Sequence, residues 1–185
     1  MTTIDLGGAE EPLSLADAKS WARIERDDED DLIADLIRAG REAIERETQL
    51  ALMVRSFRLI LDPVPLDGWI VATRRPLITV ESVTAYAADG TPTVYTAEEA
   101  IAERPRGTEA FRLAEPVIQG AANGVEITFQ AGFADADRPS DLVLALKMLV
   151  ATSYEARALV SRDMQPALRP ALAEHLIAPY RRVRL

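Results

Sequence analysis

Hydrophobic positions divide the chain into helical ends and a strand-like middle. Residues 32–44 carry apolar side chains every three or four positions, which predicts an amphipathic helix with one buried face. The same spacing predicts a helix over residues 15–24 and another from about 139 to 159. A shorter helix is expected at about 170–177.

Two residues give further information on the predicted N-terminal helices. Ser14 can cap the first helix, with Asp17 at the capping-box distance in place of the preferred Glu. Gly40 lies inside the second predicted helix, where glycine costs about 1 kcal/mol relative to alanine. A close approach between two helices would explain its presence.

The periodicity changes to strand-like alternation at about residue 51. Asp89-Gly90 is a strong hairpin signal between two of the predicted strands. Residues 97–109 are polar and contain proline, so a loop is expected there. The predicted strands lie in MVRSFRLILD, WIVAT, ITVESVTAYA, PTVYT, AFRLA and GVEITFQAGF.

These elements predict an α+β fold, in which terminal helices form a small bundle and an antiparallel sheet is inserted between them. Residues 1–50 are assigned to the N-terminal helices, and residues 51–133 to the inserted sheet subdomain. Residues 134–178 are expected to complete the helical domain. Residues 179–185 are interpreted as a C-terminal docking arm.

Charge is distributed unevenly along the 185 residues, which carry a formal net charge of -9. The net charge is -8 over residues 1–50, -4 over 51–135 and +3 over 136–185. An acidic front argues against general binding to nucleic acid, which needs a basic face. Opposite charge at the two ends is compatible with head-to-tail packing of identical subunits, and also with two merely solvated ends.

Residues for catalysis or for binding a metal or cofactor are scarce. The chain has no cysteine and one histidine, His175, so neither a zinc site nor a catalytic triad is expected. The acidic run 27–31 lacks the glycine turn of a calcium loop and is typical of a helix start. No phosphate-binding glycine motif occurs, and Trp21 and Trp69 are predicted to be core or interface residues. We therefore predict no catalytic, metal or cofactor site.

No membrane segment or leader is expected either. The apolar run LVLALKMLV is short and contains Lys147, and MTTIDLGGAEEP lacks the pattern of a signal peptide. The expected location is the cytoplasm, at least until the protein is built into an assembly.

The segment after Pro179 has the composition of a binding segment. Tyrosine and arginine are enriched at binding hot spots, and two apolar residues spaced by one position suit an extended strand. We expect it to be disordered in the free protein and to dock on a partner. A frayed basic end is the alternative interpretation. The candidate partner-binding residues are Tyr180, Arg181, Arg182, Val183, Arg184 and Leu185.

The order of several segments resembles the head–tail connector, or adaptor, proteins of tailed bacteriophages and phage-derived gene transfer agents. The resemblance covers nearly the whole chain, and Phe133 replaces the usual tyrosine of its Ala-Gly-aromatic triplet. The segments that carry it are PLSLADAKSWARIERDDEDDLIADLIRAGREAIERET, RRPLITVESVTAYAADGT, VEITFQAGFADADRPSDLVLALKMLVATSYEAR and LIAPYRRVRL.

The resemblance implies a structural role in the particle. Such proteins form a ring beneath the portal, with a subunit number that follows the portal's twelvefold symmetry. The ring extends the channel for double-stranded DNA, without sequence-specific binding, and links the head to the tail stopper or terminator protein. It further implies that the portal is the partner of the C-terminal arm.

Two other functional classes of protein would need different sequence features. A small cytoplasmic regulatory or nucleic-acid-binding protein would need a basic helix face that reaches base edges, and the arginines near the C-terminus are too clustered for that. An enzyme would need converging polar groups with shifted pKa values in a pocket.

Overall fold

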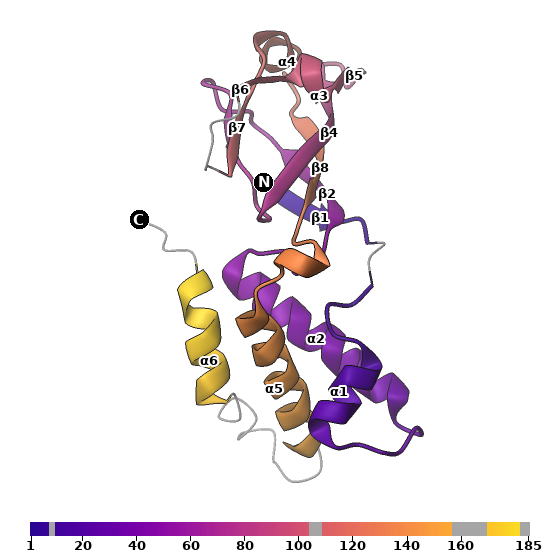
Figure 1. Cartoon of the computed structure of the whole chain (residues 1–185). Helices are drawn as coiled ribbons and strands as arrows, with labels where there is room; N and C mark the ends of the chain where they lie inside the picture. The colour runs from indigo at the N-terminus through magenta and orange to yellow at the C-terminus, as the bar shows by residue number, and fades with distance from the viewer. Residues whose placement is uncertain (8–9, 104–108, 157–169, 182–185) are drawn as a thin grey trace. The chain divides into compact units, whose positions relative to one another are not determined.

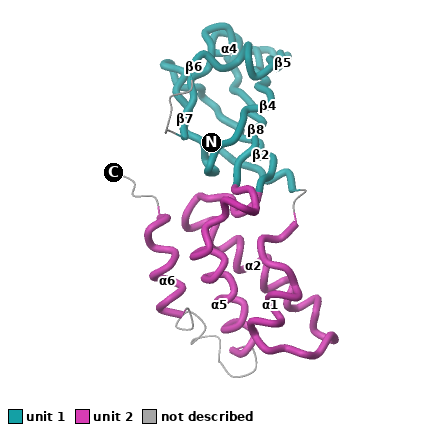
Figure 2. Tube along the Cα trace, viewed as in Figure 1, with its two compact units in different colours: residues 1–9, 54–132 teal, residues 10–53, 133–185 magenta. Residues whose placement is uncertain are grey.

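The structure is a computed structural model, and it describes residues 1–7, 10–103, 109–156 and 170–181. It contains helices and antiparallel strands, which confirms the predicted α+β class. The chain forms two compact units (Figure 2). The sheet unit consists of residues 1–9 and 54–132, and the helical unit of residues 10–53 and 133–185.

The sheet unit contains two antiparallel sheets (Figure 1). Five strands form one sheet in the order β1-β2-β8-β4-β5, and three form another in the order β3-β7-β6. The strands are β1 (Thr2–Asp5), β2 (Arg55–Leu61), β3 (Trp69–Val71), β4 (Leu77–Tyr86), β5 (Pro92–Thr96), β6 (Ile101–Glu103), β7 (Ala110–Leu113) and β8 (Val125–Ala131).

The alternation read from the sequence sets the buried face of the larger sheet. Phe57 and Leu59 of β2 are buried opposite Phe129 and Ile127 of β8, their register partners. The rings of Phe57 and Phe129 stack with centroids 5.7 Å apart. Because side chains alternate between the faces of a strand, the intervening residues remain partly exposed on the other face.

The predicted hairpin joins β4 to β5. Ala87 N–H donates to Thr91 O at 3.0 Å, and Gly90 adopts a φ of 84° inside the turn. The Asp89 carboxylate accepts from Thr91 N–H at 2.9 Å, and this bond lowers the pKa of Asp89. The hairpin signal in the sequence is therefore confirmed.

Four short elements of the sheet unit differ from the expectation. The N-terminal residues had been assigned to the helical domain, whereas β1 pairs with β2 and belongs to the sheet unit. The expected loop 97–109 contains the one-turn helix α3 (Ala97–Ala100) and β6. Thr96 and Glu99 form a capping box that starts α3, and α4 (Glu115–Gly120) follows β7.

In its described residues, the helical unit packs four main helices around one hydrophobic core (Figure 1). They are α1 (Leu15–Ala22), α2 (Asp30–Thr48), α5 (Ser140–Ala156) and α6 (Ala171–Ile177), with the 3-10 turns η1 (Asp135–Asp137) and η3 (Ala178–Tyr180). The predicted cap of α1 is confirmed, because Ser14 Oγ accepts from Asp17 N–H at 3.1 Å. The fully buried side chains of its core include Ile33, Ile44, Leu52, Leu142, Leu146 and Ile177.

Gly40 marks a close approach between α2 and α5. A Cβ atom added at Gly40 would lie 2.8 Å from Cδ1 of Leu146 and 3.9 Å from Cβ of Leu149. Leu146 is fully buried in the helical core, so its side chain has little room to move aside. The glycine is thus explained by packing.

We predict that Gly40→Leu destabilises the protein by about 1–3 kcal/mol, because the larger side chain overpacks the contact with α5. Ala39→Leu, at the exposed neighbouring position, is the matched control and should have little effect. Thermal unfolding of both variants measures the difference. Equal midpoints for the two variants would contradict close packing at Gly40.

Candidate partner-binding surface

The structure describes the first two residues of the predicted docking arm and attaches both to the helical unit. Tyr180 ends η3 and packs, partly buried, against the helical core. Burial raises the pKa of its hydroxyl, and the charge of Asp141 and a hydrogen bond to it raise this pKa further. Pro179 lies inside η3, so α6 ends at Ile177 and continues as a tighter turn.

Arg181 is held by two carboxylates of the same unit. Its guanidinium group pairs with Glu174 of α6 and with Glu47 of α2, and these hydrogen bonds raise its pKa. The other predicted arm residues, Arg182, Val183, Arg184 and Leu185, lie outside the described residues. The structure therefore fixes the root of the predicted arm, at Tyr180 and Arg181.

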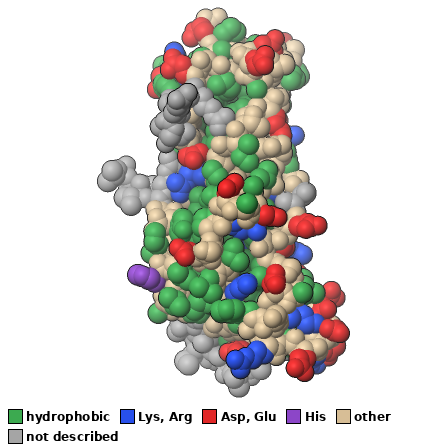
Figure 3. Space-filling view, in the orientation of Figure 1, with side chains coloured by type: hydrophobic (Ala, Val, Ile, Leu, Met, Phe, Trp, Pro, Cys, Tyr) green, Lys and Arg blue, Asp and Glu red, His purple; other side chains and the backbone are tan. Residues whose placement is uncertain are grey.

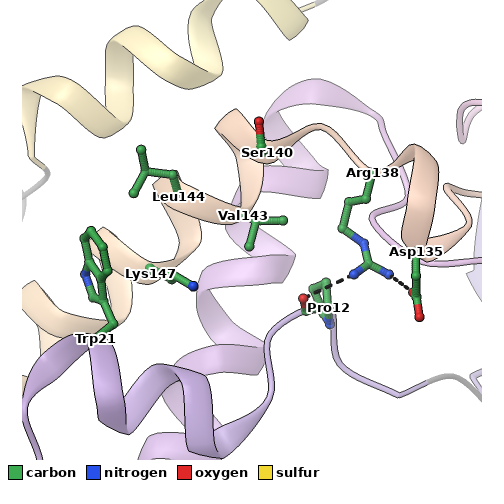
Figure 4. Close-up of a pocket in the computed structure, with 8 residues that line it drawn as sticks. All are labelled: Pro12, Trp21, Asp135, Arg138, Ser140, Val143, Leu144 and Lys147. Atoms are coloured by element: carbon green, nitrogen blue, oxygen red, sulfur yellow. Dashed lines mark hydrogen bonds and ion pairs between the residues drawn. The ribbon is translucent and has the colours of Figure 1, made fainter.

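A shallow groove of about 360 Å³ lies on the helical unit between α1 and α5 (Figure 4). Its apolar part is formed by Trp21 of α1 together with Val143 and Leu144 of α5. Its charged groups are Lys147, Arg138 and Asp135. The groove is completed by Pro12 and Ser140.

Trp21 is the most conspicuous residue of this groove. It is 48% exposed, so it is not a core residue. Lys147 places its ammonium group 5.8 Å from the centroid of the Trp21 ring, a cation–π contact. A half-exposed tryptophan beside apolar side chains is typical of a binding hot spot.

Arg138 closes one end of the groove and joins segments that are distant in sequence. Its Nε donates to Leu52 O at 2.6 Å, and its Nη1 donates to Pro12 O at 3.2 Å. Its Nη2 also pairs with Asp135 at 2.6 Å. Because Leu52 and Pro12 are buried residues, their carbonyl groups have restricted access to water.

The acidic run after α1 is organised by cations rather than by a metal. Lys19 pairs with Asp27 at 2.5 Å and with Asp30 at 2.6 Å, and Arg26 pairs with Asp28. Figure 3 shows acidic side chains gathered with basic ones at this end of the helical unit. Among the residues that the structure describes, no group of three His, Cys, Asp or Glu side chains could hold a metal ion.

Two arginines of the sheet unit, Arg55 and Arg74, lie near the ring of Phe57. Arg55 pairs with Asp5, and its guanidinium carbon lies 5.2 Å from the centroid of the Phe57 ring. The guanidinium carbon of Arg74 lies 6.0 Å from the same ring. Since Arg55 is buried and tied to β1 through Asp5, these contacts pack the sheet unit.

The single histidine and the described helices bear on the other functions considered from the sequence. His175 is exposed on α6. None of the described helices combines the length and the hydrophobicity that crossing a bilayer requires. The groove residues were not found from the sequence, since Val143, Leu144 and Trp21 fit an ordinary amphipathic pattern.

Comparison with known proteins shows which protein family and which solved structures the chain resembles. Residues 12–87 match the family of phage gp6-like head-tail connector proteins. Two solved structures align over 100% of this chain and 97% of theirs, with 26% sequence identity and a TM-score of 0.78. One is a chain from the neck of an empty gene transfer agent particle with C6 symmetry, and the other is from a native gene transfer agent virion.

A third structure, from the neck of a native gene transfer agent particle with C12 symmetry, shares the fold with a TM-score of 0.73 at 24% identity. No curated protein shows a significant match. The resemblance to head–tail connectors is therefore confirmed, by sequence over residues 12–87 and by fold over the whole chain. The match and the shared fold support a structural connector role for the chain.

We predict that Arg138→Ala destabilises the helical unit by about 1–3 kcal/mol, because it leaves two buried carbonyl groups without their donor. Arg26→Ala, which removes a mostly exposed arginine from surface ion pairs, is the matched control and should have a smaller effect. Urea unfolding measures both. Equal losses would show that Arg138 is only a surface residue.

Proposed function

We propose that the chain forms a ring at the head–tail junction of a phage or gene transfer agent particle. The ring lies beneath the portal, extends the DNA channel and carries the tail stopper or terminator protein on its other side. The observation that carries this proposal is the full-length likeness to a chain of a particle neck. The similar neck structures were computed with C6 and C12 symmetry, which supports a ring, and twelve is the copy number that we propose for it.

Three properties of the chain support a structural role rather than catalysis. The described residues offer no metal cluster, and the groove between α1 and α5 is shallow and open. The net charge of -9 suits a channel that double-stranded DNA traverses without being held through its phosphates. Assembly takes place in the cytoplasm of the host cell, and the protein ends up in the particle.

The portal is proposed as the partner of residues 180–185. Tyr180 and Arg181 root this segment on the helical unit, and Arg182 to Leu185 supply alternating basic and apolar side chains. One such arm gives weak binding because ordering it costs conformational entropy. A ring of arms binds as a single multivalent object, which makes the combined attachment strong.

A particle-producing strain that lacks this chain tests the proposed function. We expect DNA-filled heads and free tails to accumulate separately, because nothing joins the portal to the tail. Electron microscopy of the lysate counts tailed particles, and expression of the intact chain from a plasmid should restore them. A normal yield of tailed particles without this chain would refute the connector role.

We predict that deleting residues 182–185 leaves the thermal midpoint unchanged but abolishes attachment to the portal. The cut is placed after Arg181 because Tyr180 and Arg181 contribute to the helical unit itself, so removing them would disturb the fold. Co-sedimentation with portal assemblies measures the attachment, which should weaken with salt.

Charge variants test whether attachment to the portal depends on the basic side chains or only on the length of the arm. Arg182→Glu with Arg184→Glu should lose attachment, whereas Arg182→Lys with Arg184→Lys should retain most of it. Arg38→Glu, an exposed charge reversal on α2, is the control. If the shortened chain binds the portal at full occupancy, the arm is not the anchor.

A further inference from the structure

The helical unit exposes two large hydrophobic side chains among the residues that the structure describes. Trp21 of α1 is 48% exposed and Leu172 of α6 is 53% exposed. The other exposed large hydrophobic residues belong to the sheet unit. Burying either side chain in a contact would be favourable, since each hydrophobic side chain removed from water contributes to binding.

The two side chains belong to helices on opposite flanks of the helical unit, α1 and α6. Helix α5 lies between α1 and α6 in both Figure 1 and Figure 4, and it packs against each of them. A closed ring of identical subunits requires two different, complementary surfaces on opposite flanks of each subunit. The positions of Trp21 and Leu172 meet this requirement.

The two surfaces also differ in shape. Trp21 stands beside the groove between α1 and α5, which is a concave surface. On the other flank, the exposed residues Leu172, His175 and Pro179 are spaced by three and four positions, so they form one stripe along α6 and η3. Figure 3 shows hydrophobic side chains exposed on this flank. A helix that exposes a leucine in such a stripe suits a groove with an apolar part.

The two surfaces carry different charged groups. The groove carries two cations, Lys147 and Arg138, and one carboxylate, Asp135. Beside α6, Arg181 pairs with Glu174 of the same helix and with Glu47 of α2, and Asp141 of α5 contacts the Tyr180 hydroxyl.

We propose that neighbouring copies in the ring meet by placing α6 of one copy in the groove between α1 and α5 of the next. This contact rests on the proposed ring and specifies its subunit interface. A second copy of this chain is the occupant because one chain supplies both the groove and the stripe that matches it. Trp21 and Leu172, each exposed in the single chain, become buried in the same contact.

The absence of cysteine in the chain makes disulfide trapping a direct test. Leu144 lines the groove and Leu172 lies in the α6 stripe, so Leu144→Cys with Leu172→Cys places one thiol on each side of the contact. Particles carrying this double variant are purified, oxidised and resolved on a denaturing gel without reductant. We expect a ladder of linked copies that collapses to single chains when reductant is added.

Each single variant should remain unlinked, since the contact brings together two different surfaces. Ala39→Cys with Leu172→Cys, where residue 39 is exposed on α2 away from the groove, is the matched control pair and should give no ladder. If the double variant is present in the particles but gives no ladder, the proposed contact is wrong while the ring stands. If the chain is absent from wild-type particles, both the contact and the proposed function fail.

A charge introduced into the stripe provides a second test that does not rely on trapping. Leu172→Asp changes an exposed residue, so the isolated protein should keep its thermal midpoint. We expect about tenfold fewer tailed particles, because a hot-spot contact is lost at every subunit interface. Leu66→Asp, at a 97% exposed position of the sheet unit, is the control. A particle yield equal to that of the control would overturn the contact.

Discussion

The buried backbone of Leu52 is the constraint on which the helical unit depends. The chain leaves this unit just after Leu52 and returns near Phe133, so the outgoing and returning segments must be fixed together. The N–H group of Leu52 donates to Glu45 at 2.8 Å, and its carbonyl oxygen accepts from Arg138, 86 positions later in the chain. Arg41 binds Glu45 at 3.0 Å and Glu11 at 2.8 Å, so the buried carboxylate of Glu45 is paired. Losing one member of such a network typically costs about 1–3 kcal/mol where it leaves a neutral buried group unpaired, and about 3–5 kcal/mol where it leaves a buried charge unpaired.

This arrangement explains how a helical unit can carry a large insertion. The core between α2 and α5 is made by segments on either side of the sheet unit, and the glycine at position 40 allows the two helices to approach closely. The hydrogen bonds of Leu52 to Glu45 and Arg138 join the segment that leaves the helical unit to the segment that returns to it. In a ring, the helical unit would supply the contacts between copies through α1, α5 and α6, and the root of the C-terminal arm starts from the same unit.

Much of the fold could be predicted because long elements repeat their pattern. The stripe of α2 and the alternation of β2 and β8 extend over several turns or residues, so periodicity identified them. Helix α3 and strand β6 are three or four residues long, too short for periodicity to indicate. The pairing of β1 with β2 joins residues more than 50 positions apart, which no local pattern encodes. The groove was missed because the exposure of Trp21 depends on how α1 packs on α5, and the packing of Tyr180 depends equally on tertiary contacts.

The central claim is that this chain forms the ring that joins head and tail. A reconstruction of the neck of particles from a strain that makes this protein tests it most directly, since each of the two units can be fitted separately as a rigid body. The account predicts twelve copies in one ring directly beneath the portal, with density for Arg182 to Leu185 reaching the portal surface. A neck in which this fold is absent, or in which it occupies a position that does not contact the portal, would contradict the account.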